Sequence, residues 1–388
     1  MDSTRHGDHY LSYDVGSPWL RVSKDAVMIR FVLSVFGLLA GCHTVLSQTI
    51  DDVPMAEPGS GICVSAKLIY DLDDRPTPQC HASTIAETND GFVAAWFAGT
   101  HEKNPDVAIR VARYDGSHWT ESMEVANGLQ THGTRLPCWN PVLFQPADGP
   151  LMLFYKVGKS PSQWWGMLTT SNDAGKTWAT PRKLGTDSKL GTNPHLAGPI
   201  KNKPVQLADG SILCPSSSEH LGWRVHFERT RDLGKTWEVI GPINDASRFD
   251  AIQPSILTYA DGRMQILCRS RQKVLATSWS DDFGTTWSPL SDAGLPNPNS
   301  GTDAVTLRDG RQLLVYNHTT RGGGFPAGRE MLNVAISDDG ETWIPVITLE
   351  KRDASEFSYP AVIQAKDGKV HITYTYLRKG VKHVVLDP

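Results

Sequence analysis

The stretch that decides the fold is Ser171-Asn-Asp173-Ala-Gly175-Lys-Thr177-Trp178. Its Asp carboxylate can accept hydrogen bonds from turn amides, Gly175 supplies a positive φ, and Trp178 offers a large ring that packs between neighbouring sheets. The pattern, an Asp box, returns at 230–237, 280–287 and 338–343, and in a shortened version at 115–119. Repeats separated by roughly 50 to 60 residues are typical of propellers and arrays.

A second recurring feature is an Asp-Gly pair between two apolar runs, which predicts a tight β-hairpin. Five of the six pairs precede an Asp box by roughly 20 to 30 residues, so each repeat has two hairpin turns and four antiparallel strands. Independent two-stranded hairpins are the alternative, but such hairpins are marginally stable alone. The pairs are Asp90-Gly91, Asp148-Gly149, Asp209-Gly210, Asp261-Gly262, Asp309-Gly310 and Asp367-Gly368.

The repeats predict an all-β fold, a six-bladed β-propeller of four-stranded antiparallel blades, over residues 63–388. The last repeat lacks an outer strand. The apolar run 66–72 precedes the first repeat, and we expect it to supply that strand and close the ring.

The N-terminal residues 1–48 have no repeat features and are expected to form an extension and an export signal. Residues 31–40 are apolar but too few to span a bilayer. The stretch ends in the sequence Leu39-Ala-Gly-Cys42. This arrangement resembles a bacterial lipoprotein signal with Cys42 as the lipidated residue. Cleavage near Ser47-Gln48 is the alternative, Met28 is a possible true start, and 49–62 reads as a linker.

Charge and cysteine content limit the partners. The chain of 388 residues has 38 basic and 42 acidic residues and no basic run, so we expect no nucleic-acid partner. We expect a monomer without a cofactor or a required metal, attached to a membrane only through Cys42. Five further cysteines lack zinc-site spacing; Cys80 and Cys138 either form a disulfide or, like the others, are small buried side chains.

Strand alternation puts the Asp-Gly hairpins and the Asp boxes on one face of the propeller, so the remaining two loops of each blade lie on the other. Functional residues usually lie on loops that rigid strands hold in place. This second face is polar, cationic and aromatic, which suits an acidic sugar. Its candidate residues are His81, Asn140, 201–203, Asp250, Gln253, Asn299, Asp303, Glu356 and Tyr359 before inner strands, and His101, Glu102, Asp106, Lys156, 164–165, 216–220, Arg269, Arg271, 318–329 and 376–378 in the other loops.

These motifs resemble the sialidase (neuraminidase) superfamily, in its BNR/Asp-box branch, over residues 66–388. In that family three arginines bind the substrate carboxylate, a Tyr assisted by a Glu is the nucleophile, and an Asp is the acid/base. The resemblance implies that Arg269 is the second arginine, Arg329 the third and Tyr359 the nucleophile.

Three family positions differ. His81-Ala-Ser replaces the first arginine motif, 96–100 lacks the acid/base Asp, and Gln253 stands where the Glu that assists the tyrosine belongs. An amide cannot take the proton of a phenol. We expect a replacement among His81, Glu102 and Asp106, although Asp106 could equally fix its loop, and Arg269 would stabilise the phenolate of Tyr359.

Three functions remain open from the sequence. The first is a secreted exo-α-sialidase-like glycoside hydrolase that cleaves a terminal acidic sugar. The second is a polysaccharide lyase or rhamnosidase-like enzyme acting next to a uronic acid, and the third is an acidic-glycan-binding propeller without turnover. For all three we expect substrate contacts from Arg269, Arg329, Arg271, Asn140, Lys156, Trp165 and Asp303.

Overall fold

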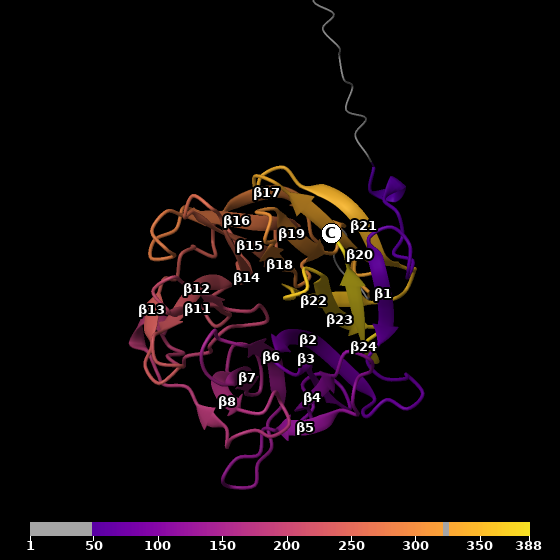
Figure 1. Cartoon of the computed structure of the whole chain (residues 1–388). Coiled ribbons are helices and arrows are strands. Elements are labelled where there is room, and N and C mark those ends of the chain that lie inside the picture. Colours follow the sequence, from indigo (N-terminus) through magenta and orange to yellow (C-terminus); the bar gives the residue numbers. More distant parts are fainter. Residues whose placement is uncertain (1–48, 321–325) are drawn as a thin grey trace, which may run out of the picture. The chain divides into compact units, whose positions relative to one another are not determined.

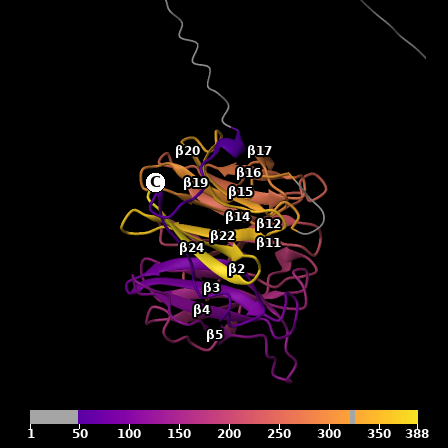
Figure 2. The same ribbon diagram turned by 90° about the vertical axis from the view of Figure 1, so that its right-hand side faces the viewer.

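The computed structural model describes residues 49–320 and 326–388. They form six four-stranded antiparallel sheets arranged around a common axis as a β-propeller (Figure 1). In Figure 2 the sheets of this propeller are seen from the side. The predicted fold class and strand arrangement are confirmed.

Each of the first three blades runs outward from its inner strand in chain order. Their strands are β2 (Gln79–Thr88), β3 (Gly91–Gly99), β4 (Ala108–Tyr114) and β5 (Met123–Ala126); β6 (Cys138–Phe144), β7 (Leu151–Val157), β8 (Trp165–Ser171) and β9 (Arg182–Lys183); β10 (Val205–Gln206), β11 (Ile212–Ser218), β12 (Arg224–Thr230) and β13 (Glu238–Ile240).

Blades four and five repeat this order, whereas blade six takes its outer strand from the start of the propeller. Their strands are β14 (Ala251–Thr258), β15 (Met264–Ser270), β16 (Val274–Ser280) and β17 (Ser291–Pro296); β18 (Asp303–Thr306), β19 (Gln312–Tyr316), β20 (Met331–Ser337) and β21 (Ile344–Lys351); β22 (Phe357–Gln364), β23 (Val370–Tyr376), β24 (Gly380–Leu386) and β1 (Cys63–Leu68).

The ring is closed by β1, which pairs antiparallel with β24. The predicted closing strand is therefore confirmed, although it spans Cys63–Leu68 and not 66–72. The segment 49–62, expected to be a linker, contacts blade five: Met55 forms a bridge with Thr348, and the amide of Ala56 donates to the Thr348 carbonyl at 2.8 Å. The chain thus ties blades five and six together before the first blade begins.

The Asp boxes do what their residues predict. Asp173 accepts the amide of Thr177 at 2.8 Å and its hydroxyl at 2.6 Å, and these bonds hold the pKa of the carboxyl well below its usual range. Trp287 of blade four stacks on Phe227 of blade three, with ring centroids 4.5 Å apart. The boxes therefore fix the turns and also join neighbouring blades.

The five cysteines of the described residues are all buried and free. The Cys80–Cys138 disulfide is therefore wrong, and the alternative, small buried side chains, is confirmed. Cys80 packs with Ala94 and Trp96 and Cys138 with Leu143 and Tyr155, so the two lie in different apolar clusters. Cys42 lies outside the described residues.

Candidate active site

The inner strands carry an unusual backbone feature where they approach the axis. Ala82, Asn140, Gln253 and Tyr359 have positive φ of 53°, 35°, 59° and 53°, and each sits where the pairing register of its inner strand shifts. Non-glycine residues adopt such φ values only when the surrounding structure imposes them, and such bulges redirect side chains next to active sites. Three of these residues, Asn140, Gln253 and Tyr359, line one axial cavity.

Arg269 is the centre of this site. From β15, its Nη1 donates to the Tyr359 hydroxyl oxygen and, at 3.3 Å, to Gln253 Oε1. Its Nε and Nη2 bind Asn299 Oδ1 at 3.0 and 2.8 Å, which fixes the plane of the guanidinium. Arg269 is only 7% exposed, so its charge acts in a poorly hydrated place. The expected adjacency of Arg269, Gln253 and Tyr359 is present.

Two more arginines flank this centre and share one carboxylate. Arg329 Nη1 and Arg378 Nε each donate to Glu356 Oε1 at 3.0 Å, and Arg378 Nη1 donates to Glu102 Oε2 at 2.6 Å. Burial acts to raise the pKa of Glu356, but the two arginines outweigh it and the pKa is lowered. The Arg329 guanidinium lies 5.5 Å from the Tyr359 ring centroid.

Arg378 is a residue that reasoning from the sequence missed as an individual candidate. It lies in the tight connection between β23 and β24, where both Leu377 and Arg378 have positive φ. In the family pattern an arginine is expected on the first inner strand, where this chain has His81. Arg378 of blade six lies close to His81, and the two residues line one small pocket together with Glu102. They are far apart in the sequence, and the packing of β2 against β22 and β23 of blade six brings them together.

His81 packs directly against the tyrosine. The two ring centroids are 4.1 Å apart, and His81 Nδ1 lies 2.9 Å from Thr375 Oγ1. Burial, followed by the charges of Arg378, Arg329, Arg269 and Lys201, holds the pKa of His81 well below its usual range. His81 is therefore neutral near pH 7, and the same surroundings make it a weaker base than a free imidazole.

The cavity over these residues has a volume of about 140 Å³. Part of its wall is aromatic: Trp139 and Trp164 meet edge to face at 5.9 Å, and the Arg269 guanidinium lies 5.1 Å from the ring centroid of Trp223. Aromatic planes beside cationic groups suit a sugar ring that carries an acid group. The lining residues are His81, Phe97, Glu102, Trp139, Asn140, Pro161, Trp164, Glu219, Trp223, Ile252, Gln253, Arg269 and Tyr359.

Several predicted site residues lie elsewhere. Asp106 Oδ2 accepts the amide and hydroxyl of Thr100 at 2.9 and 2.6 Å, which is the loop-fixing arrangement. Trp165 faces Lys183, and its neighbour Trp164 lines the cavity in its place. Arg271 lies at the rim, stacked 4.4 Å from Trp223 and paired with Asp250.

Lys156 and Asp303 are interior residues. The Lys156 ammonium is fully buried and donates to the carbonyl of Pro199, and burial lowers its pKa to about 7. Asp303 accepts from Lys203 at 3.0 Å and from the Val362 amide at 2.9 Å, which joins inner strands β18 and β22. Both side chains are buried and hold the scaffold through these bonds, and neither lines the cavity.

A buried lysine supports the floor of the site. Lys201, with φ 72°, donates to the carbonyls of Thr302 and Pro360 and to Asn202 Oδ1 at 2.8 Å. Asn202 Nδ2 in turn donates to the Gln253 carbonyl at 2.9 Å. Blade three therefore ties down the chain beside Tyr359 and at Gln253, which explains how these strained residues keep their conformation.

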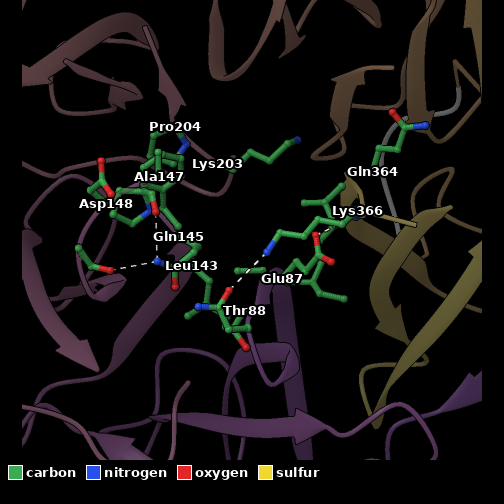
Figure 3. A pocket seen from close by; sticks show the side chains of 17 residues that line it. Glu87, Thr88, Leu143, Gln145, Ala147, Asp148, Lys203, Pro204, Gln364 and Lys366 are labelled. Carbon is green, nitrogen blue, oxygen red and sulfur yellow. Dashed lines mark hydrogen bonds between the residues drawn. The ribbon is translucent and has the colours of Figure 1, made fainter. Parts of the chain in front are cut away.

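The opposite, hairpin face has a larger axial cavity of about 550 Å³, drawn in Figure 3. Its side chains come from inner strands and hairpins of several blades. The backbone amide of Lys366 donates to Glu87, and the Lys203 ammonium binds Asp303, which lies outside the cavity lining. It has neither an arginine nor an aromatic cluster, so the arginine-lined cavity is the candidate active site. Across residues 49–320 and 326–388 we find no group of three or more metal-ligating side chains.

In the same described ranges, no helix has both the length and the apolar character needed to cross a membrane.

Comparison with known proteins supports the architecture. The BNR repeat-like domain model matches residues 90–372. A Dyadobacter fermentans protein of unknown function superposes with a TM-score of 0.67 at 16% identity, covering 84% of this chain and 98% of that one. A Hadza microbial sialidase gives 0.66 at 17% identity, covering 82% and 68%.

The intramolecular trans-sialidase from Ruminococcus gnavus gives a TM-score of 0.64 at 13% identity, covering 85% of this chain and 98% of that one. No curated protein sequence matches the chain. At such identities the solved structures establish the fold, and the family model covers most of the propeller. The chain belongs to the BNR repeat-like domain family.

Proposed function

We propose that this propeller is an exported, exo-α-sialidase-like glycoside hydrolase that removes a terminal acidic sugar from glycans. The observation that carries the proposal is Tyr359 held between a buried guanidinium, Arg269, and a neutral imidazole, His81. Sialidases among the solved structures of the same fold support the substrate class. Export and a lipid anchor at Cys42 complete the proposal.

The arginines bind the sugar's carboxylate. Arg269, Arg329 and Arg378 come from blades four, five and six, and all three surround the ring of Tyr359 or the adjoining His81. Arginine forks match carboxylates in geometry, and burial makes each such bond stronger than in water. The anomeric carbon of the bound sugar is then directed toward the Tyr359 oxygen.

Tyr359 is the nucleophile and His81 its base. Gln253 cannot accept a phenolic proton as a carboxylate would. The neutral ring of His81, which packs on Tyr359 with the centroids 4.1 Å apart, has an unprotonated nitrogen and is the base that we propose in its place. Arg269 already donates to the phenol oxygen and stabilises the charge that develops there.

The same neutral imidazole beside a phenol favours one second candidate, β-elimination next to a uronic acid. There the arginines would neutralise the uronate, and His81 or Tyr359 would remove the proton beside it. The two reactions differ in their products, because a lyase leaves an unsaturated uronate that absorbs ultraviolet light and a hydrolase releases the free acidic sugar.

The experiment is incubation with a panel of sialylated and uronate-capped oligosaccharides, followed by analysis of released sugar and ultraviolet absorbance. We expect free sialic acid, with kcat lowered about 10²-fold or more in Tyr359→Phe and in His81→Gln. Tyr114→Phe, on the Asp-box side of blade one, is the matched control and should keep full activity. Glycan binding without any product, or unchanged activity in both site variants, contradicts the proposal.

A further inference from the structure

We infer that Glu219 is the catalytic proton donor, protonating the glycosidic oxygen as the acidic sugar leaves. This inference rests on the proposed function and supplies the one group that the family pattern leaves absent at 96–100. Glu219 lies in the connection between β11 and β12, on the same face as Tyr359, and lines the same cavity.

The position of Glu219 is set by the aromatic wall. Its Oε2 accepts from Trp223 Nε1 at 3.1 Å, and Trp223 is itself held between the guanidinium groups of Arg269 and Arg271, at 5.1 and 4.4 Å. Within residues 49–320 and 326–388 the second oxygen, Oε1, accepts no hydrogen bond, which leaves it for the substrate. The carboxyl group thus has a fixed orientation in a cavity that also contains the nucleophile.

Charge distinguishes Glu219 from the two other carboxyl groups near the cavity. Glu102 and Glu356 each accept a bond from Arg378 at 2.6 and 3.0 Å, and an arginine partner favours the ionised form. Within the described residues the hydrogen bond given to the Glu219 carboxyl comes from a neutral indole. Burial, which outweighs Arg269 and Arg271, raises the pKa of Glu219.

In many active sites the environments of two carboxyl groups move their pKa values apart. The group with the raised pKa then acts as the acid, and the other stays charged. The other candidate donors are committed elsewhere: Asp106 Oδ2 is bound to Thr100, and His81 is neutral. The raised pKa of Glu219 favours its protonated form, whereas the lowered pKa of Glu356 favours its charged form, and Glu102 binds Arg378.

The reaction balances with these groups. The Tyr359 oxygen bonds to the anomeric carbon as the bond from that carbon to the glycosidic oxygen breaks, and the phenolic proton passes to His81. The Glu219 proton moves to the departing oxygen, giving an alcohol. In the second half a water oxygen bonds to the anomeric carbon as the Tyr359 bond breaks, the water proton returns to Glu219, and His81 returns its proton to Tyr359.

The test compares Glu219→Gln on two substrates that share the acidic sugar but differ in leaving group. An alkyl or sugar alcohol must be protonated as it leaves, whereas a nitrophenolate leaves without help. We expect kcat/KM on the natural glycoside to fall by about 10²- to 10⁴-fold, and on the nitrophenyl glycoside by less than about tenfold. The basic limb of the pH profile on the natural glycoside should also disappear.

Two further variants make the result specific. Glu219→Asp keeps a carboxyl group and should restore the basic limb. Glu102→Gln, which removes the carboxylate bound to Arg378, should lower kcat/KM on both substrates to a similar extent. Equal loss on both substrates in Glu219→Gln, or no loss on either, overturns the inference while the wild-type enzyme remains active. A wild-type protein that cleaves neither substrate overturns the proposed function itself.

Discussion

Two stacked histidines make the stability of the propeller depend on acidity. His371 of β23 and His383 of β24 share a hydrogen bond of 3.0 Å between Nδ1 and Nε2, and His371 stacks on Phe92 with centroids 4.0 Å apart. Both are about 5% exposed or less. Burial lowers the pKa of His371 to about 4 and that of His383 to about 3.

The sign follows from proton uptake. An unfolded histidine, with a pKa near 6.5, becomes protonated between pH 7 and pH 5, while the folded pair stays neutral, so the unfolded state is favoured as the pH falls. One unit of pKa difference corresponds to about 1.4 kcal/mol. The free energy of unfolding therefore falls by about 2 kcal/mol for each histidine between pH 7 and pH 5, or by about 4 kcal/mol for the pair. The contribution of the neutral histidine pair to the stability of the fold is fully present above pH 6.5.

The perturbation is the double change His371→Gln with His383→Gln, and the assay is denaturant unfolding at pH 7, 6 and 5. We expect wild type to lose about 4 kcal/mol more than the variant between pH 7 and 5, whatever the variant's stability at pH 7. Contributions from His81 and from the carboxyl groups occur in both proteins and cancel. Equal pH slopes in the two proteins would refute the reasoning.

Two other predictions concern the arginines and the thiols. Arg378→Met should destabilise the fold by about 2 kcal/mol, because Glu356 loses one of its two arginines, and it should raise KM for an acidic sugar. Arg271→Met, whose partner Asp250 is 3.4 Å away at the surface, should cost less than about 1 kcal/mol; equal losses of stability in the two variants would contradict this reading. The five buried cysteines should resist a thiol reagent in the native protein and all react after unfolding, and rapid labelling without denaturant would show that the blades open.

Much of the architecture could be predicted because its signals are local. Asp173, Gly175 and Trp178 lie within one turn, so the amide bonds, the positive φ and the aromatic packing of that turn are visible in eight residues. The same turn recurs along the chain, which strengthened the prediction. The last repeat lacks its outer strand, and this predicted the closing strand. The errors, such as the proposed Cys80–Cys138 bond, came from equating similar places in neighbouring blades with contact.

The residues of the candidate site could be predicted only where their place in the repeat indicates that the side chain faces the cavity. The repeats place Gln253 and Tyr359 near the start of inner strands and Arg269 near the end of a second strand, on one face, and the family resemblance selected them there. Trp165, Lys156 and Asp303 were wrong as cavity residues, because residue type alone does not reveal which side chain is turned into the cavity and which is bound in the interior.

The sequence by itself determined the repeat, the blade number, the face that carries the candidate site and the tyrosine in it, because each depends on residues close together in the chain. The tertiary structure alone decided that Arg378 lies in the pocket of His81, that His81 is neutral and that Glu219 has no arginine hydrogen-bonded to it among the described residues. Those properties depend on burial and on charges brought in from other blades, and no local pattern of residues carries that information.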